Sequence, residues 1–258
     1  MTKPKVAFFD FSSCEGCQLQ VANLGEALLD ILNLVDLVEF REVMSERWSG
    51  RYSVTFAEGS INSDESAERL RRLRERSDIL VAYGSCAAIG GVNGMQNRIP
   101  REKLISTVYG DCPFGVETAE VRAIHQVVKV DYTLLGCPVY PPEFLSLLKA
   151  ILGGHSWQAS GNAVCVECKL NENVCQYDLG ATCLGPITRG GCNAWCINNG
   201  NVCYGCRGMV SNPNMAGAEE VLRRYSLKPE LIAGKMGMYT GTADELKISS
   251  DMLSAVDK

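Results

Sequence analysis

The stretch Lys5-Val-Ala-Phe-Phe-Asp-Phe-Ser-Ser-Cys-Glu-Gly-Cys17 decides the fold, because an apolar run is followed at once by two cysteines and a helical pattern. The run over 5–11 has the length and composition of a buried β-strand. The next segment, 18–32, carries apolar residues at helical spacing, and a second strand-like run follows over 34–40. Strands that alternate with helices predict right-handed crossovers and a parallel sheet.

The same alternation continues through the first half of the chain. Further strand-like runs lie at 52–57, 78–83 and 131–135, and helical patterns lie at 66–76, 118–126 and 142–152. The arginines between Arg69 and Arg76 are interpreted as a solvated helix face. We therefore predict an α/β fold with a doubly wound parallel sheet over 1–154, an architecture that binds ligands outside the carboxyl ends of its strands.

The composition changes after Gly154. Residues 155–212 are rich in Gly, Asn and Cys and contain few long apolar runs, so this segment needs additional links to hold a fold. Its eight cysteines are the obvious candidates. The remaining residues, 213–258, form a tail with one amphipathic helix predicted around 218–225, and we expect the tail to pack on the assembly.

Charge and hydropathy exclude several classes of partner. A formal charge of -5 gives no electrostatic reason to expect nucleic acid or an anionic membrane. No stretch approaches the ~18 consecutive apolar residues of a spanning helix. The N-terminus shows no apolar signal segment and no twin-arginine pair, so we do not expect export on its own signal.

Thirteen cysteines are unusual in such a chain. Disulfides suit small secreted domains, and an odd number leaves at least one cysteine unpaired. Metal binding is therefore the favoured interpretation, and the spacing of the cysteines has to identify the metal.

Four cysteines follow predicted strands. Cys14 and Cys17 follow the first strand, Cys86 lies just past the strand that ends at Tyr83, and Cys137 lies just past the strand that ends at Leu135. In a doubly wound sheet those strand ends share one edge, so the four sulfurs can converge. Cys14 and Cys17 alone would also fit a thioredoxin-like redox pair. Cys112 is left over and is interpreted as structural.

Eight cysteines within 42 residues form two further groups of four. The first group is Cys165, Cys168, Cys175 and Cys183, and the second is Cys192, Cys196, Cys203 and Cys206. Zinc also accepts four thiolates from paired CxxC motifs. Twelve cysteines in three tetrads, with no His in this stretch, favour iron–sulfur clusters, because a chain of redox centres gives all three sites one purpose.

Over about residues 4–210 the sequence resembles the small subunit of nickel–iron hydrogenases. The strongest match is Cys175-Gln-Tyr-Asp-Leu-Gly-Ala-Thr-Cys183-Leu-Gly-Pro-Ile-Thr-Arg-Gly-Gly-Cys192, followed by the closing Cys203-Tyr-Gly-Cys206. The Cys-x-Gly-Cys motif at 14–17, Ala57-Glu-Gly-Ser-Ile61, Gly-Ser-Cys86-Ala and Gly-Cys137-Pro match in the same order.

The resemblance implies a flavodoxin-like first half and three [4Fe–4S] clusters. It implies a proximal cluster held by Cys14, Cys17, Cys86 and Cys137, a medial cluster held by Cys192, Cys196, Cys203 and Cys206, and a distal cluster held by Cys165, Cys168, Cys175 and Cys183. The NiFe centre would lie in a separate large subunit. This chain would act in a hydrogenase, an oxidoreductase acting on H2, but would perform no catalysis alone. Glu58 lies in a motif near the proximal cluster, and no role is carried over for it.

Two departures from the exported members are informative. Cys165 stands where those members have His, and Cys196 stands where they usually have Pro and a three-iron cluster. An additional thiolate adds negative charge and lowers the cluster potential. A low-potential path suits a flavin/Fe–S diaphorase-type partner, so we expect the cytoplasmic, multimeric group that includes sulfhydrogenases, F420-non-reducing hydrogenases and NAD(P)- or ferredoxin-linked bifurcating enzymes.

Three alternatives remain at this point. A single-cluster subunit of the respiratory complex I type would carry two adjacent cysteines, which this chain lacks. A zinc-stabilised interaction protein would bind zinc in place of iron. A stand-alone flavin enzyme would need the sheet crevice that the cysteines at the strand ends would occupy.

Overall fold

Five strands form one parallel sheet in the order β2-β1-β3-β4-β5, which is the flavodoxin-like order and confirms the predicted α/β class. The computed structural model describes residues 2–110, 119–211, 220–221, 224–225, 234–235 and 237–242. The strands are β1 (Lys5–Asp10), β2 (Asp36–Phe40), β3 (Tyr52–Glu58), β4 (Ser77–Tyr83) and β5 (Tyr132–Leu134).

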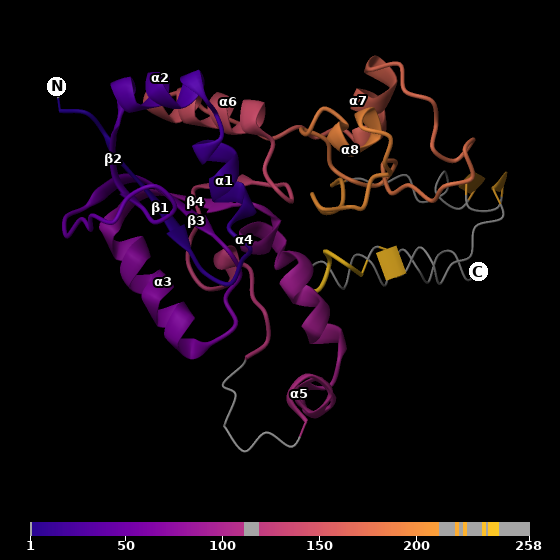
Figure 1. Ribbon diagram of the computed structural model, residues 1–258, viewed down its shortest axis with the longest axis horizontal. Helices are drawn as coiled ribbons and strands as arrows, with labels where there is room; N and C mark the ends of the chain where they lie inside the picture. Colours follow the sequence, from indigo (N-terminus) through magenta and orange to yellow (C-terminus); the bar gives the residue numbers. More distant parts are fainter. Residues whose placement is uncertain are drawn as a thin grey trace.

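The helices cover both faces of the sheet (Figure 1). One face packs against α1 (Gly16–Ala22), α2 (Glu26–Leu34) and α6 (Pro141–Leu152), and the other packs against α3 (Asp64–Arg76). On the first face, Phe8 stacks on Phe56 with ring centroids 4.8 Å apart, and Phe144 of α6 contacts Phe56 edge-on at 5.3 Å. Aromatic burial of this kind anchors α6 to the centre of the sheet.

Helix α3 begins at a capping box between Ser63 and Ser66 and buries Ala67, Leu70 and Leu73 against the sheet. Its arginines differ from the sequence-based expectation. Arg74 forms an ion pair with Asp131 at 2.7 Å, and Arg76 donates a hydrogen bond to the carbonyl oxygen of Gly50 at 3.0 Å.

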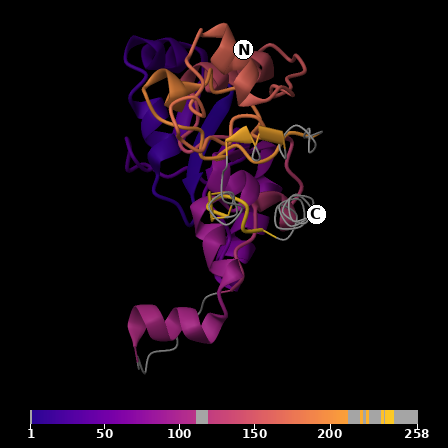
Figure 2. The ribbon, with the colours of Figure 1, turned by 90° about the vertical axis from the view of Figure 1, so that its right-hand side faces the viewer.

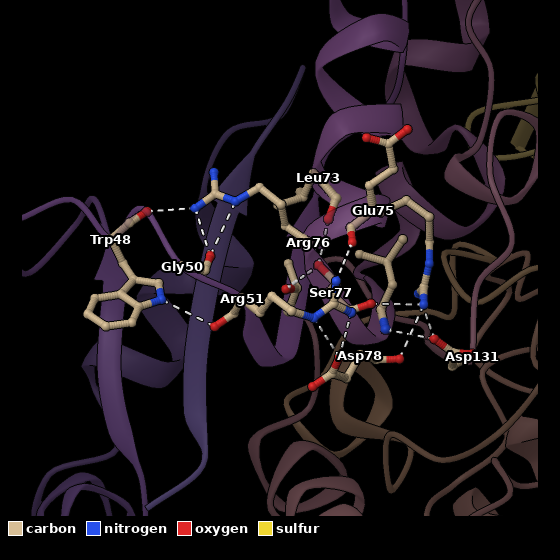
Figure 3. A network of polar contacts seen from close by, with 12 residues as sticks. Trp48, Gly50, Arg51, Leu73, Glu75, Arg76, Ser77, Asp78 and Asp131 are labelled. Carbon is tan, nitrogen blue, oxygen red and sulfur yellow. Dashed lines mark hydrogen bonds and ion pairs between the residues drawn. The ribbon is translucent and has the colours of Figure 1, made fainter.

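Figure 3 shows these contacts as one network. In the same network, Arg51 pairs with Asp78 at 2.7 Å. The network joins the amino-terminal ends of β3, β4 and β5, away from the edge where the cysteines lie. The prediction of a solvated arginine face is therefore wrong for Arg74 and Arg76.

Two predicted helices differ in the structure. The helix expected over 18–32 is broken into α1 and α2 around Gly25, whose φ of +60° is readily adopted by glycine. The prediction of a helix over 118–126 is wrong. Ile61 and Arg122 exchange two backbone hydrogen bonds, and this pairing draws the backbone before the short 3-10 helix η2 (Ile124–Gln126) out of helical geometry.

Five elements were not predicted. In the first half they are α4 (Ser85–Ile89), η1 (Gly91–Arg98) and α5 (Arg101–Tyr109), and in the Cys-rich segment they are α7 (Val164–Leu170) and α8 (Trp195–Asn198). Figure 2 shows α5 projecting away from the sheet. The Cys-rich segment has its own apolar cluster, which includes Val164, Leu184, Ile187 and Ile197.

No helix among the described residues has the length and apolar character needed to cross a bilayer. Cys112 lies outside the described residues, and so do four of the eight residues of the helix predicted at 218–225, namely 218, 219, 222 and 223.

Candidate functional site

The carboxyl ends of four strands are aligned residue by residue. Asp10 of β1 pairs with Glu58 of β3, Glu58 pairs with Tyr83 of β4, and Tyr83 pairs with Leu134 of β5. All four strands therefore end at the same edge of the sheet. The cysteines predicted there follow three of the strands: Cys14 and Cys17 lie just before and in the first turn of α1, Cys86 lies in α4, and Cys137 lies in the loop after β5. Strand β3 ends in Glu58 itself.

These cysteines form the proximal set, Cys14, Cys17, Cys86 and Cys137. Burial raises the pKa of Cys17, and the thiols of Cys137 and Cys86 raise it further. Burial also raises the pKa of Cys86 to about 12, with added contributions from Cys137 and Cys14. The four thiols thus lie within reach of one another's charge, although the sequence separates them widely.

Glycine leaves the space that the proximal sulfurs occupy. A Cβ atom at Gly84, whose φ is +87°, would lie 2.5 Å from the sulfur of Cys17. A Cβ atom at Gly91 would lie 2.8 Å from the sulfur of Cys86. Larger residues at these two positions would fill the volume beside the thiols, so the backbone forms a cradle that an inorganic group can enter.

Glu58 orients the start of α1, a role that sequence reasoning did not assign. Its side chain is buried and accepts hydrogen bonds from the backbone N–H groups of Cys17 at 3.2 Å and Gln18 at 3.0 Å. Burial raises the pKa of Glu58, and the two N–H groups partly offset that shift. Tyr83 also donates from its hydroxyl to the carbonyl oxygen of Cys17 at 3.0 Å.

The distal set is Cys165, Cys168, Cys175 and Cys183. Burial, together with the other three thiols, raises the pKa of Cys165 to about 12. A Cβ atom at Gly185 would lie 3.3 Å from the sulfur of Cys165 and 3.5 Å from that of Cys183, so these two sulfurs flank one glycine. Helix α7 supplies Cys165 and Cys168, and the loop after it supplies the other two.

The medial set is Cys192, Cys196, Cys203 and Cys206. Burial, together with the thiols of Cys192 and Cys196, raises the pKa of Cys206 to about 12. Burial also raises the pKa of Cys203, which lies near both Cys206 and Cys183 of the distal set. The electrostatic contacts of Cys206 and Cys203 follow the grouping that the spacing indicated, and the division into three ligand sets stays a prediction.

Backbone hydrogen bonds connect neighbouring sets. Cys137 of the proximal set lines one pocket together with Cys192, Cys196 and Cys206 of the medial set. The N–H of Cys203 donates to the sulfur of Cys183 at 3.3 Å. Ser85, next to Cys86, donates from its hydroxyl to the carbonyl oxygen of Cys206. The medial set consequently lies between the other two.

Arg207 and Glu143 form a buried ion pair that sequence reasoning missed. The guanidinium contacts both carboxylate oxygens, at 2.7 and 2.8 Å, and its side chain is only 1% exposed. Arg207 also donates to the carbonyl oxygens of Gly190, at 2.8 Å, and of Leu135. It therefore joins α6, the loop after β5 and the Cys-rich segment beside the medial set.

The chemistry of the donors fits metal better than disulfides. All twelve described cysteines are free thiols. Within the parts of the chain that the structure describes, no three Cys, His, Asp or Glu side chains form a group suited to holding a metal ion. Four thiolates are the ligands of iron–sulfur cubanes and of four-cysteine zinc sites. The glycine cradles and the N–H groups directed at sulfur fit an anionic thiolate cluster.

Comparisons with known proteins identify the family. The family model described as NADH ubiquinone oxidoreductase, 20 kDa subunit, matches residues 14–151. Sulfhydrogenase 2 subunit delta of Pyrococcus furiosus is 35% identical to this chain, with coverage of 90% of this chain and 97% of the relative. A subunit of the F420-non-reducing hydrogenase of Methanocaldococcus jannaschii is 30% identical, with coverage of 83% and 85%.

A solved structure agrees with these relatives. A chain of the NAD+-reducing [NiFe]-hydrogenase in the H2-reduced state superimposes with a TM-score of 0.53 at 27% identity, over 60% of this chain and 93% of that chain. The chain therefore belongs to the family of the 20 kDa subunit of NADH ubiquinone oxidoreductase and, within it, to the small subunits of nickel–iron hydrogenases.

Proposed function

We propose that this chain is the electron-transfer small subunit of a cytoplasmic [NiFe] hydrogenase and that it holds three [4Fe–4S] clusters. The proximal, medial and distal sets would each supply the four thiolate ligands of one cluster. Residues 1–154 would form the domain with the proximal cluster, 155–212 the two-cluster segment, and 213–258 the tail.

One observation carries this proposal: the three thiol sets are joined in series. Cys137 and the medial Cys206 line one pocket, and the N–H of Cys203 donates to the sulfur of the distal Cys183. Three separate structural zinc sites would have no need of such an order. A path for electrons requires the three sets to lie in series, because each centre must lie close to the next.

The protein's own groups would bind, space and shield these centres. The clusters, when bound, accept and release single electrons. Glu58 fixes the N-terminus of α1 beside Cys17, and the Arg207–Glu143 pair holds the Cys-rich segment against the sheet domain. Burial of Cys17, Cys168, Cys183 and Cys203 keeps water from one side of every set.

The partners follow from exposure and family. Cys14 and Cys137 of the proximal set are exposed, so a second subunit would have to cover this side of the site. We assign that position to the large subunit with the NiFe centre. A flavin/Fe–S diaphorase-type subunit would exchange electrons at the distal end, as the name of the NAD+-reducing structural relative suggests.

Anaerobic purification of the full chain, expressed without its partner subunits, tests the proposal. We expect about twelve irons and about twelve sulfides per chain, together with a brown colour and the electron paramagnetic resonance (EPR) signals of reduced cubanes. Stoichiometric zinc without inorganic sulfide would support the zinc-stabilised alternative instead. About four irons per chain would support a single-cluster subunit of the complex I type.

A further inference from the structure

Glu167 lies between two cysteines of the distal set, but its carboxylate binds the loop that carries a cysteine of the medial set. The residue belongs to α7, the helix that supplies the first two distal thiols. Its carboxylate accepts hydrogen bonds from the backbone N–H of Ala194, at 3.1 Å, and from that of Gly191. These two donors flank Cys192, the first cysteine of the medial set. One side chain therefore connects the two cysteine groups.

The backbone just before Cys192 is held from two sides. A Cβ atom at Gly190 would lie 2.9 Å from a carboxylate oxygen of Glu167, and one at Gly191 would overlap the guanidinium of Arg207. Arg207 also donates to the carbonyl oxygen of Gly190 at 2.8 Å. Glycine at both positions leaves room for the two side chains, so the loop lies in contact with each of them.

The backbone just after Cys192 has an unusual conformation. Asn193 and Ala194 have φ angles of +53° and +51°, a region that residues other than glycine rarely adopt. Such a conformation persists where the surrounding contacts fix it. The N–H of Ala194 bonds Glu167, and Asn171, which follows α7 directly, donates to the carbonyl oxygen of Asn193 at 3.0 Å. The α7 segment therefore determines where Cys192 lies.

Glu167 also brings a carboxylate close to the sulfur of Cys192. The distance between this sulfur and the nearer carboxylate oxygen is 3.9 Å. The two backbone donors to Glu167 are neutral groups and do not cancel its charge. On the other side of the loop, the charge of Arg207 is balanced by both carboxylate oxygens of Glu143. A thiolate ligand at Cys192 would therefore lie beside a net negative charge.

We propose that Glu167 is a positioning residue for the medial cluster: it fixes the loop of Cys192, and its charge lowers the potential of the cluster that this cysteine would bind. Negative charge near an iron–sulfur cluster disfavours the addition of an electron. Because Glu167 belongs to the helix of two distal thiols, it also links the geometry of consecutive sets. This inference rests on the proposed function, since it requires a cluster in the medial set.

Glu167→Gln removes the charge and keeps the length of the side chain. In the full chain, purified anaerobically without its partner subunits, EPR-monitored redox titration should show a higher potential for the cluster whose signal Cys196→Ala alters. We expect the equilibrium constant for its reduction to rise about three- to tenfold, which corresponds to ~28–59 mV for one electron. The amide oxygen can still accept an N–H bond, so the iron content should stay at the wild-type value. A purely structural role would leave the potential unchanged.

Glu172→Gln is the matched control. Glu172 lies just after α7 and is exposed, and the change removes the same unit of charge. It should leave the medial potential at the wild-type value. Glu167→Asp is the second variant, because it keeps the charge but withdraws it by one methylene group. It should raise the medial potential less than Glu167→Gln does.

The outcomes separate this inference from the proposed function. Clusters in the wild-type chain together with an unchanged medial potential in Glu167→Gln would overturn the role of Glu167 and leave the proposed function standing. An equal shift in Glu172→Gln or in Glu167→Asp would also overturn it, because the effect would not then depend on the charge beside Cys192. If Glu167→Gln does not hold the medial cluster, a potential of Glu167→Asp at or below the wild-type value overturns the inference. A wild-type chain without iron would remove the proposed function itself.

Discussion

The backbone N–H of Cys203 donates a hydrogen bond to the sulfur of Cys183 across 3.3 Å, so the medial and distal sets are in direct contact. The next residue, Leu184, donates back to the carbonyl oxygen of Cys203 at 2.9 Å. This two-way pairing fixes the spacing of the two sets through main chain, which is stiffer than a contact between side chains. In the proposed function the distal set is the end of the series, so loss of this set should interrupt electron transfer without changing the chemistry of the partner.

Cys168→Ala tests that order. It removes one buried thiol of the distal set, and we expect H2-dependent reduction of the acceptor to fall about 10- to 100-fold. H2/D2 exchange, which needs no electron to leave the complex, should keep its wild-type rate. Cys112→Ala is the control and should preserve both activities, since Cys112 belongs to none of the three sets. An undiminished acceptor reduction in Cys168→Ala would contradict the proposed series.

Cys196→Ala tests the fourth medial ligand. The variant has one thiolate fewer, so we expect the iron content to fall by about one per chain and a three-iron signal to appear in EPR of the oxidised protein. The medial potential should rise, because a smaller negative charge opposes reduction less. Retention of the full iron content with an unchanged medial potential would show that Cys196 is not a ligand.

The sheet was predictable from sequence because its strands are apolar runs bounded by turns. The convergence of Cys17, Cys86 and Cys137 was predictable too, since parallel strands end at one edge. The failed helix at 118–126 has a physical reason. The backbone N–H and C=O groups of Arg122 form hydrogen bonds with Ile61, which lies 61 residues away in the chain. Local periodicity cannot reveal such a pairing.

The contacts around the thiol sets were less predictable. Arg207 follows Cys206 directly, but its partner Glu143 lies on α6. From the sequence alone, Glu143 is an ordinary acidic residue in the first turn of a helix. Residues 237–242 lie in a tail with little periodicity, and the close approach of Gly94 and Gly241 brings them to the sheet domain. Both relationships depend on packing between segments far apart in the chain, which no local pattern encodes.

Gly84→Ala tests the cradle of the proximal set. The new methyl group would lie 2.5 Å from the sulfur of Cys17, so we expect loss of the proximal cluster and a fall of about four irons per chain. Gly154→Ala is the control, because Gly154 also has a positive φ, +66°, but has open space around its Cβ position. Both replacements carry backbone strain, and at Gly84, whose ψ is 166°, the strain is roughly 1–3 kcal/mol. An equal loss of iron in both would assign the effect to strain and not to the cradle.

Removing one partner of the buried Arg207–Glu143 pair should lower the free energy of unfolding far more than removing one partner of a surface pair with the same N–O distance. Removing one partner leaves the other charge buried, so Arg207→Met should lower the free energy of unfolding by about 3–5 kcal/mol. Arg207→Met combined with Glu143→Met should cost much less than the sum of the two single changes, since no charge is then stranded. The control is Arg51→Met, because Arg51 and Asp78 are also 2.7 Å apart but have side chains that are 65% and 58% exposed. That change should cost at most about 1 kcal/mol. Anaerobic urea denaturation of the full chain measures all four variants, and additive effects of the Arg207 and Glu143 changes would show that the pair is not coupled.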